Sequence, residues 1–286
     1  MNRCLTFILL PAALFAAPAF AQDQAAAPAG PAPDVSGDSI TIGVGGVYMP
    51  DYEGSNDYRL SPAPGVLASV HGFNFTLAGD RASLDIIPDR SKSGWDFQAG
   101  PVAGIDFNRS TLSQIEDLRV HRLGKRDSSL EVGGFVGIGK TGIFTSPYDK
   151  LSFSVSYRKG ISGANRAGIL SPTLTYFTPV SRKAAIGVLA SAERAERGYA
   201  EVYYDVDAAQ SLRSGLPVFH TRGGWKNYAV GLLGTRAITG DLLHGFKLVG
   251  VVSYTHLLND FADSPIVSIA GSKSQWLGIL GVAYTF

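Results

Sequence analysis

The chain ends with the stretch Q-W-L-G-I-L-G-V-A-Y-T-F, which covers residues 275 to 286 and closes on a phenylalanine. Its large apolar residues occupy even positions: Trp276, Leu280, Val282, Tyr284 and Phe286. Side chains alternate between the two faces of a strand, so these five would share one face. A one-sided strand that closes on an aromatic residue is typical of the last strand of a bacterial outer-membrane β-barrel. We therefore expect a membrane barrel, in which Leu280→Arg harms the lipid face more than Gly281→Ala harms the lumen face.

The beginning of the chain predicts export. Residues 1–21 contain a basic start with Arg3, an apolar core and the small-residue site Ala19-Phe20-Ala21, which is the pattern of a cleavable signal peptide. Cleavage would remove Cys4, the one cysteine of the chain, so disulfides are not expected. Residues 22–37 are rich in alanine and proline and are expected to form a disordered periplasmic leader. Residues 38–286 would form the barrel in the outer membrane of a Gram-negative cell.

Composition excludes several classes of protein. Lys and Arg total 25 against 24 for Asp and Glu, so the net charge of +1 offers no surface for nucleic acid. The mean hydropathy is +0.10, and no segment after the signal has the apolar run of a membrane helix. A chain that spans a bilayer with strands must close them into a barrel, because every backbone polar group needs a partner there.

The remaining sequence divides into alternating segments. Ile40, Ile42 and Val44 share one face of the first segment, and Leu151, Phe153 and Val155 alternate with serines in another. Because Pro62 and Pro64 suit a loop or a strand edge, we do not count the residues around them as a separate strand. We merge them with the segment that follows into one strand from about residue 64 to 77, with a turn at residues 79–81. The result is an all-β, antiparallel, up-and-down barrel of about 12 strands.

Strand parity then assigns the connections to the two sides of the membrane. Residues 51–61, 205–223 and 259–273 become outer-surface loops, and residues 108–127 fall on the periplasmic side. In this last segment Leu112, Ile115 and Leu118 have helical spacing, and Ser113 with Glu116 fits a capping box. The sequence predicts a short periplasmic helical element, which serves either as a lid on the barrel rim or as a docking site for a partner.

Four short motifs occur in a fixed order along the chain. They are D-Y-E-G-S-N-D-Y-R at 51–59 followed by two prolines, L-E-V-G-G-F at 130–135, R-S-G-L-P at 213–217 and D-S-P-I-V at 263–267. Together they resemble the MipA/OmpV family of outer-membrane proteins over nearly the whole mature chain. One stretch departs from the family pattern: residues 199–205 read Y-A-E-V-Y-Y-D where an aromatic-rich Y-M-x-x-Y-F stretch is expected.

The resemblance implies a function without catalysis. It suggests an envelope scaffold whose partners are a lytic transglycosylase and a penicillin-binding protein, in contact with outer-membrane lipid and lipopolysaccharide and not with nucleic acid. The family supplies no catalytic residues to transfer, so the expectation is no catalytic, cofactor-binding or metal-binding residues, no cofactor and no enzyme activity. The alternatives are a channel for small solutes and, third, an outer-membrane lipid hydrolase.

Two groups of residues are considered as candidate functional sites, one for calcium and one for hydrolysis. Asp51, Glu53 and Asp57 offer oxygen ligands that suit calcium, although their spacing is not that of an EF-hand and an ordered loop explains them better. His256 lies near a strand end, where a hydrolase would need a serine beside it, but the following residues are leucines. We interpret His256 as a residue of the barrel rim.

Overall fold

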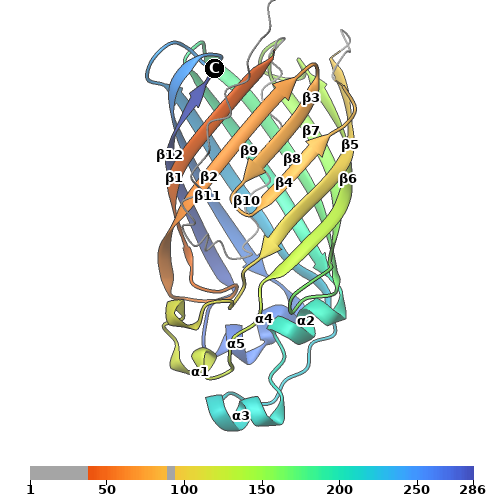
Figure 1. The fold of residues 1–286 in the computed structure, drawn as a ribbon, viewed down its shortest axis with the longest axis vertical. Coiled ribbons are helices and arrows are strands. Elements are labelled where there is room, and N and C mark those ends of the chain that lie inside the picture. The colour runs from red at the N-terminus through yellow and green to blue at the C-terminus, as the bar shows by residue number, and fades with distance from the viewer. Residues whose placement is uncertain (1–37, 89–93) are drawn as a thin grey trace, which may run out of the picture.

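The computed structural model describes residues 38–88 and 94–286 and forms a closed barrel of twelve antiparallel strands (Figure 1). Each strand pairs with its chain neighbours, and the first strand closes the barrel against the last, with Val44 opposite Val282. The predicted fold class and strand number are confirmed, whereas the expected signal peptide and leader lie outside the described residues. The strands are β1 (Ser39–Pro50), β2 (Tyr58–Val70), β3 (Phe73–Ala78), β4 (Arg81–Asp85), β5 (Trp95–Asp106), β6 (Ser129–Thr141), β7 (Lys150–Gly160), β8 (Gly168–Ser181), β9 (Ala184–Ala195), β10 (Gly224–Ala237), β11 (Gly245–Leu257) and β12 (Ser274–Thr285).

Apolar and small residues alternate across the wall as the sequence predicts. In β12, Trp276, Leu280 and Val282 are exposed on the outer face, while Leu277 and Ala283 are buried toward the lumen. The outer residues of β1 follow the same rule and include Ile40, Ile42 and Val44. These outward side chains supply the apolar band that contacts lipid in an outer-membrane barrel.

The merged strand at residues 64–77 is wrong. The chain reverses at His71 and Gly72, whose φ angles are 54° and 84°, so β2 and β3 are separate strands of a hairpin. A two-residue turn with both φ angles positive matches the twist of the flanking strands. The backbone N–H of His71 donates to Oδ1 of Asp38 at 2.7 Å, which holds the turn against the start of β1. The next turn lies at Gly79 and Asp80, close to its predicted position.

The two ends of the barrel differ (Figure 1). Short turns lie at the end that holds the C-terminus, and the long connections gather at the other end, where they form a helical layer that we call the cap. Short turns are periplasmic and long loops are extracellular in barrels of this kind, so the cap faces outward. No helix in the described ranges is long and apolar enough to cross a membrane. The cap helices are the 3₁₀ turn η1 (Leu112–Gln114), α1 (Leu118–His121), α2 (Arg197–Tyr203), α3 (Ala208–Ser214), α4 (Asn259–Asp263) and α5 (Pro265–Ser268).

The segment at 108–127 belongs to the cap, so its predicted periplasmic position is wrong. Merging β2 and β3 into one strand removed one strand before this segment. Strand parity then assigned the segment to the opposite side of the membrane. The helical element exists, but it begins at Asp117, whose side chain accepts the backbone N–H groups of Arg119 and Val120, and not at a Ser113–Glu116 capping box. Ile115 is buried in the cap as a lid residue would be, whereas Leu118 is exposed.

Candidate functional site

Three of the four sequence motifs meet in the cap. Tyr52, from the first motif, is fully buried, and its hydroxyl donates to the carbonyl oxygen of Ala270 at 2.8 Å. Burial raises the pKa of this phenol. The cluster around Tyr52 draws side chains from all four long connections that build the cap: Ile115, Val120, Leu123, Val206, Leu216, Ile266 and Ala270. Segments more than 200 residues apart in the sequence therefore form one apolar core outside the barrel.

The R-S-G-L-P motif ends helix α3. Asp207 and Gln210 form a capping box at the start of the helix, and Gly215 adopts the left-handed conformation, with a φ of 75°, at its end. That turn directs Leu216 into the core. Arg213 reaches α1 and donates to the carbonyl oxygen of Arg122 at 3.3 Å. The motif is thus a helix stop that fastens α3 to the neighbouring loop.

The stretch that departs from the family pattern supplies a second core. Tyr199, Tyr203 and Tyr204 are almost completely buried, and Tyr204 contacts the ring of Phe261 edge-on at 5.0 Å between centroids. From the D-S-P-I-V motif, Ser264 donates its hydroxyl hydrogen to the Tyr204 carbonyl oxygen at 2.6 Å. Aromatic residues are therefore retained where the cap needs them, although their spacing differs.

A group of buried charges lies beneath the cap, where the barrel lumen begins. Nζ of Lys226 on β10 is 2.8 Å from Oε1 of Glu53 and 2.9 Å from Oε2 of Glu193. Arg158 on β7 bridges Glu193 and Glu131, at 3.4 Å and 3.1 Å. Glu131 comes from the L-E-V-G-G-F motif, so the fourth motif also contributes to this region. We call this group, together with Arg81, the charge cluster.

The charge cluster crosses the lumen. Arg81 on β4 and Glu193 on β9 stand on opposing walls, and NH1 of Arg81 is 3.7 Å from Oε1 of Glu193. Tyr199 of α2 joins the cap to the cluster, because its hydroxyl donates to Oε2 of Glu53 at 2.9 Å. Its ring also lies 4.7 Å from Nζ of Lys226, which is a favourable cation–π distance. These contacts cross the lumen at the cap end of the barrel and link the cap to its inner wall.

Below the charge cluster, the lumen has two unlike walls. On the β5 to β8 side, the inward residues include Ser152, Ser171, Thr173 and Thr175, and Lys150 pairs with Asp96 at 2.7 Å. On the side formed by β9 to β12 and by β1, the inward face carries a group of aliphatic side chains beside the polar Lys247, Ser253 and Thr285; the aliphatic residues are Val47, Met49, Leu189, Leu233, Val249, Val251, Leu277 and Ile279. Polar inward residues, like the serines that alternate with Leu151, Phe153 and Val155, are therefore more prominent on one side of the lumen than on the other.

Burial also controls the charges within the cap. Burial, together with the nearby Arg126, lowers the pKa of Arg109 to about 10. Its guanidinium donates to the carbonyl oxygen of Val202 at 3.1 Å. Burial raises the pKa of Asp51, whose carboxylate accepts the backbone N–H of Glu116 at 2.9 Å. Both groups tie the 108–127 segment to other loops and therefore have structural roles.

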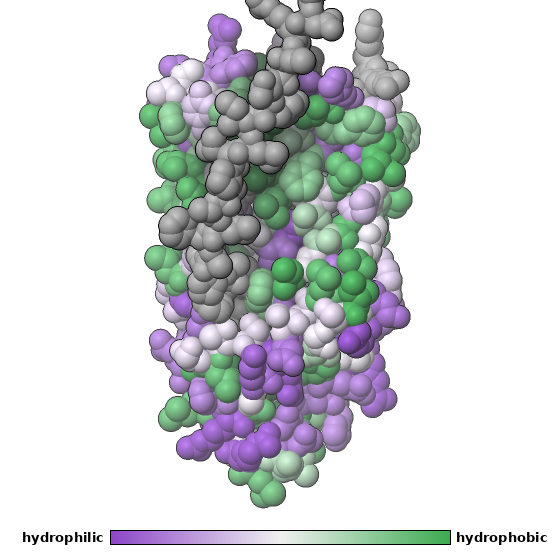
Figure 2. Space-filling view, in the orientation of Figure 1, coloured by the Kyte–Doolittle hydropathy of each residue, from purple (hydrophilic) through white to green (hydrophobic). Residues whose placement is uncertain are grey.

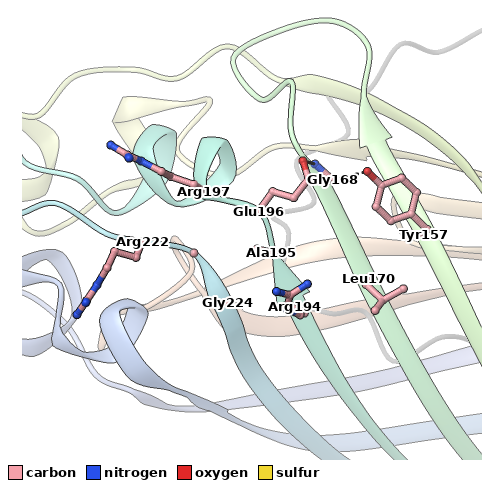
Figure 3. Close-up of a pocket in the computed structure, with 10 residues that line it drawn as sticks. Tyr157, Gly168, Leu170, Arg194, Ala195, Glu196, Arg197, Arg222 and Gly224 are labelled. Atoms are coloured by element: carbon pink, nitrogen blue, oxygen red, sulfur yellow. Dashed lines mark hydrogen bonds between the residues drawn. The ribbon is translucent and has the colours of Figure 1, made fainter.

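A cavity of about 540 Å³ lies on the outer side of the rim, between the ends of β7, β8 and β9 and helix α2 (Figure 3). Glu196 lines this cavity and accepts the Gly168 N–H at 2.8 Å and the Tyr157 hydroxyl at 2.9 Å. These hydrogen bonds lower the pKa of Glu196. Three arginines, Arg194, Arg197 and Arg222, also line this rim cavity.

The arginines of the rim cavity do not converge on one point. In Figure 3, the side chains of Arg197 and Arg222 extend away from Tyr157. Arg197 pairs with Glu201 at 2.6 Å, and Arg222 pairs with Asp260 at 3.3 Å. Each of these two guanidinium groups thus pairs with a carboxylate that lies outside the cavity. The rim cavity is therefore not a preorganised anion site.

Of the three carboxylates considered for calcium, Asp51 and Asp57 lie near each other, but Glu53 is separated from them. Glu53 binds Lys226 inside the lumen, whereas Asp51 faces the 108–127 segment. In residues 38–88 and 94–286, no group of three or more histidine, cysteine or acidic side chains is arranged to hold a metal ion.

His256 occupies the rim, as predicted, and the strand register places Ser274 of the neighbouring strand β12 opposite it. Its Nδ1 lies 3.2 Å from Oγ of Ser274 on β12 and 3.0 Å from the hydroxyl of Tyr254. The ring also lies near that of Tyr228, tilted against it with 5.5 Å between centroids. The hydroxyl of Tyr254 is in turn 2.9 Å from Oγ of Ser274, so the three side chains form a small hydrogen-bonded group.

Sequence reasoning missed the charge cluster. One signal was present: Arg158 continues the inward positions of Ser152, Ser154 and Ser156, so its charge had to lie in the lumen. A buried charge needs a partner, which predicts acidic residues on nearby strands. The identity of those partners, Glu131 and Glu193, depends on strand register.

Comparison with known proteins gives one match by sequence. The profile of a protein family described as "MltA-interacting protein MipA" matches residues 42–286. No curated protein sequence matches the chain. Among solved structures, the NanC porin is similar at 9% identity and a TM-score of 0.49, covering 85% of this chain and 98% of its own. An outer-membrane channel from Pseudomonas putida F1 is similar at 11% identity and a TM-score of 0.49, covering 90% and 98%.

Proposed function

Because this chain belongs to the MipA family and folds as an outer-membrane β-barrel, we propose that it is a non-enzymatic scaffold that binds a murein enzyme. The family description names an interaction with MltA. By the family resemblance, the partners would be a lytic transglycosylase and a penicillin-binding protein, both of which work on the murein side of the membrane.

The observation that carries this proposal is the closed cap end of the lumen. A channel needs a continuous aqueous path, and here Arg81 meets Glu193 across the barrel while the cap packs above them. A barrel without an open path is more useful as a rigid platform than as a pore. The lumen geometry therefore supports an interaction protein.

The periplasmic turns are the surface that a murein enzyme could reach. The turn between β6 and β7 exposes Phe144 and Tyr148, with 71% and 74% of their surface accessible. The carboxylate of Asp149 holds this turn in shape by accepting the backbone N–H groups of Ile143, Phe144 and Thr145. Exposed aromatic residues on a rigid turn are suited to anchoring a partner. We place the docking site on this turn.

Site-directed crosslinking tests the scaffold role. Once the export signal is removed, the chain has no cysteine, so Tyr148→Cys would carry a single attachment point for a photoreactive crosslinker. Asn56→Cys in the cap is the matched control. We expect murein enzymes among the proteins captured from position 148 in intact envelopes and not among those captured from position 56. Capture of the same proteins from both positions, or of no murein enzyme from position 148, would refute the docking site.

The main alternative is a channel for small solutes. Single-channel recording in planar bilayers separates the two functions, because the closed lumen predicts no stable openings for the purified protein. Stable openings that persist in Tyr148→Cys would favour the channel.

The hydrolase is favoured by one observation, the contact between His256 and Ser274. A serine hydrolase also needs a group that orients the histidine, and here Nδ1 faces two hydroxyls instead of a carboxylate. Incubation of the purified protein with phospholipid and lipopolysaccharide is the test, and fatty acid release that disappears in Ser274→Ala would establish the hydrolase.

A further inference from the structure

The β3–β4 hairpin covers only part of the height of the barrel. It pairs with β2 from Gly65 to Val70, and at its tip the carbonyl oxygen of Asp80 accepts the backbone N–H of Ile105 at 3.1 Å. Residues 58–63 of β2 continue toward the cap with β1 on one side and, within the described ranges, no strand on the other. Figure 1 shows that the ribbons of β2 and β5 stay apart on the cap side of the hairpin tip, which leaves an opening in the strand pairing, and Figure 2 shows this face hollowed. We call this opening the window.

Two prolines account for the window. The N–H of Gly79 donates to the carbonyl oxygen of Pro64 at 3.1 Å, so the even-numbered residues of β2 direct their backbone groups toward the hairpin side. Pro64 and Pro62 are the next even positions, and proline has no N–H to offer a neighbouring strand. The ladder therefore loses its donors where the hairpin stops. Proline also protects an exposed strand edge from pairing with another chain.

A cavity of about 240 Å³ lies behind the window. The turn at Gly79 and Asp80 and the β2 residues Ala63 and Pro64 border it on the window side. Its inner surface is the aliphatic wall of the lumen, with Val47, Leu189, Leu233, Val251, Leu277 and Ile279. Among the described residues, Thr41 and Asp80 are its only polar side chains.

This lining selects an apolar occupant. A water molecule in a cavity needs two to four polar partners, and apolar cavities instead stay dry or bind hydrocarbon. The volume is below the roughly 300 to 1,000 Å³ of pockets that hold drug-sized ligands, so it suits one slender chain. A sugar or a peptide would leave its polar groups without partners on this wall.

The route to the cavity leads from the membrane. The charge cluster closes the lumen on the cap side, and the outer side of the window is flanked by Leu60 and Val44, which are 75% and 60% exposed on the lipid face. The window lies toward the cap and hence toward the outer leaflet. We propose that the aliphatic half of the lumen binds one acyl chain of an outer-membrane lipid, which enters sideways through the window. This inference does not depend on the scaffold role.

The test uses the full-length protein reconstituted in phosphatidylcholine vesicles whose acyl chains carry a photoreactive diazirine. After irradiation, mass spectrometry locates the labelled residues. We expect label on the lumen-facing residues Leu233 and Leu277 in addition to lipid-facing residues such as Val252. Wild-type protein labelled on its lipid face alone would overturn the proposal.

Two matched pairs of variants locate the site and the route. Val251→Trp fills the cavity, and Val252→Trp places the same side chain on the lipid face of the same strand. Ala63→Trp obstructs the window, and Leu60→Trp is its lipid-facing control. We expect Val251→Trp and Ala63→Trp to lose the lumen label while both controls keep it, with folding of each barrel checked by heat-modifiable migration. Unchanged lumen labelling in the folded Ala63→Trp barrel would refute the route even if Val251→Trp failed to fold.

A second measurement identifies which lipid supplies the bound acyl chain. Native mass spectrometry of wild-type protein extracted from outer membranes would show one bound lipid, whose mass distinguishes a phospholipid from a lipopolysaccharide. Either lipid supports the site if Val251→Trp loses it and Val252→Trp retains it. Equal retention by the two variants would show that the lipid binds only the outer wall.

Discussion

Nζ of Lys226 on β10 lies 2.8 Å from Oε1 of Glu53 in the β1–β2 connection, and both side chains are almost completely buried. This ion pair fastens the cap to the inner wall of the barrel. Because Glu53 belongs to the D-Y-E-G-S motif, the motif contributes both to the apolar core of the cap, through Tyr52, and to closure of the lumen.

Removing the cation should be costly. Lys226→Met leaves Glu53 and Glu193 buried without their shared partner, and loss of one member of a buried pair costs about 3 to 5 kcal/mol. Urea unfolding of the purified barrel would measure the loss. Arg222→Met is the control, because its ion pair with Asp260 is exposed and should be worth less than about 1 kcal/mol. Equal effects of the two variants would contradict a central role for the charge cluster.

Position 280 tests the lipid face. Leu280 is 64% exposed on the outer wall, so Leu280→Arg should cost about 2 to 4 kcal/mol if it lies near the middle of the bilayer, whereas Leu280→Phe should be tolerated. Folding yield into vesicles and urea unfolding give the readout. Good tolerance of arginine would place this face outside lipid.

Substitution of Gly281 should reduce folding more than the alternation pattern alone suggests. A Cβ at this position would meet the carbonyl oxygen of Val44 at 2.8 Å and Cα of Gly45 at 3.0 Å. The β1–β12 seam approaches too closely for a methyl group, so Gly281→Ala should measurably reduce folding. A Cβ added at Gly278 would meet no atom of the described residues within 4 Å, so Gly278→Ala is the matched control and should fold normally.

Cysteine labelling should place residues 56 and 113 on the same side. Both lie in the cap and are exposed, so Asn56→Cys and Ser113→Cys should react with a membrane-impermeant maleimide on intact cells. Lys183→Cys, in the short turn between β8 and β9, should react only after the outer membrane is opened. If Ser113→Cys did not react with the maleimide on intact cells, residues 108–127 would lie on the periplasmic side, as the sequence alone suggested.

Asp149 should make the β6–β7 turn sensitive to acid. Burial alone would raise the pKa of this carboxyl, but hydrogen bonds from the Thr145 backbone, the Tyr176 hydroxyl and neighbouring N–H groups hold the pKa below its ordinary value. A lowered folded pKa gives stability that is full above the unfolded value of about 4 and is lost as pH falls toward the folded pKa.

The acid effect can be measured by comparing the wild type with Asp149→Asn. Thermal unfolding should show the wild type more stable at neutral pH, and the difference between the two proteins should shrink between about pH 5 and pH 3. A difference that stays constant over this range would mean that the carboxylate does not hold the turn through its charge.

Much of the wall could be predicted from the sequence because alternation is a local property. Leu151, Phe153 and Val155 needed no partner strand to define their face. The β2–β3 hairpin was missed since its turn residues, His71 and Gly72, do not form one of the strongest turn dipeptides, and the two prolines argued for a loop. That single miss moved residues 108–127 to the wrong end of the barrel.

The candidate sites were harder to predict. Tyr52 and Leu216 are marked as motif residues, yet nothing in the sequence states that they share one core. The pairing of His256 with Ser274 arises from the register of β11 against β12, which joins residues 18 positions apart. The sequence pattern called for a serine directly after His256 in the chain, where Leu257 and Leu258 stand instead.

The sequence by itself determined that this chain forms strands with one apolar face and that the last strand closes on an aromatic residue. Both the alternation with a period of two and Phe286 can be recognised from neighbouring residues in the chain. Only the tertiary structure decided which charges meet, where the lumen closes and where the wall opens. Arg81 and Glu193 stand on strands five places apart in the barrel, and their contact depends on the closure of the whole sheet. Closure and register are cooperative properties of all twelve strands, and no single segment encodes them.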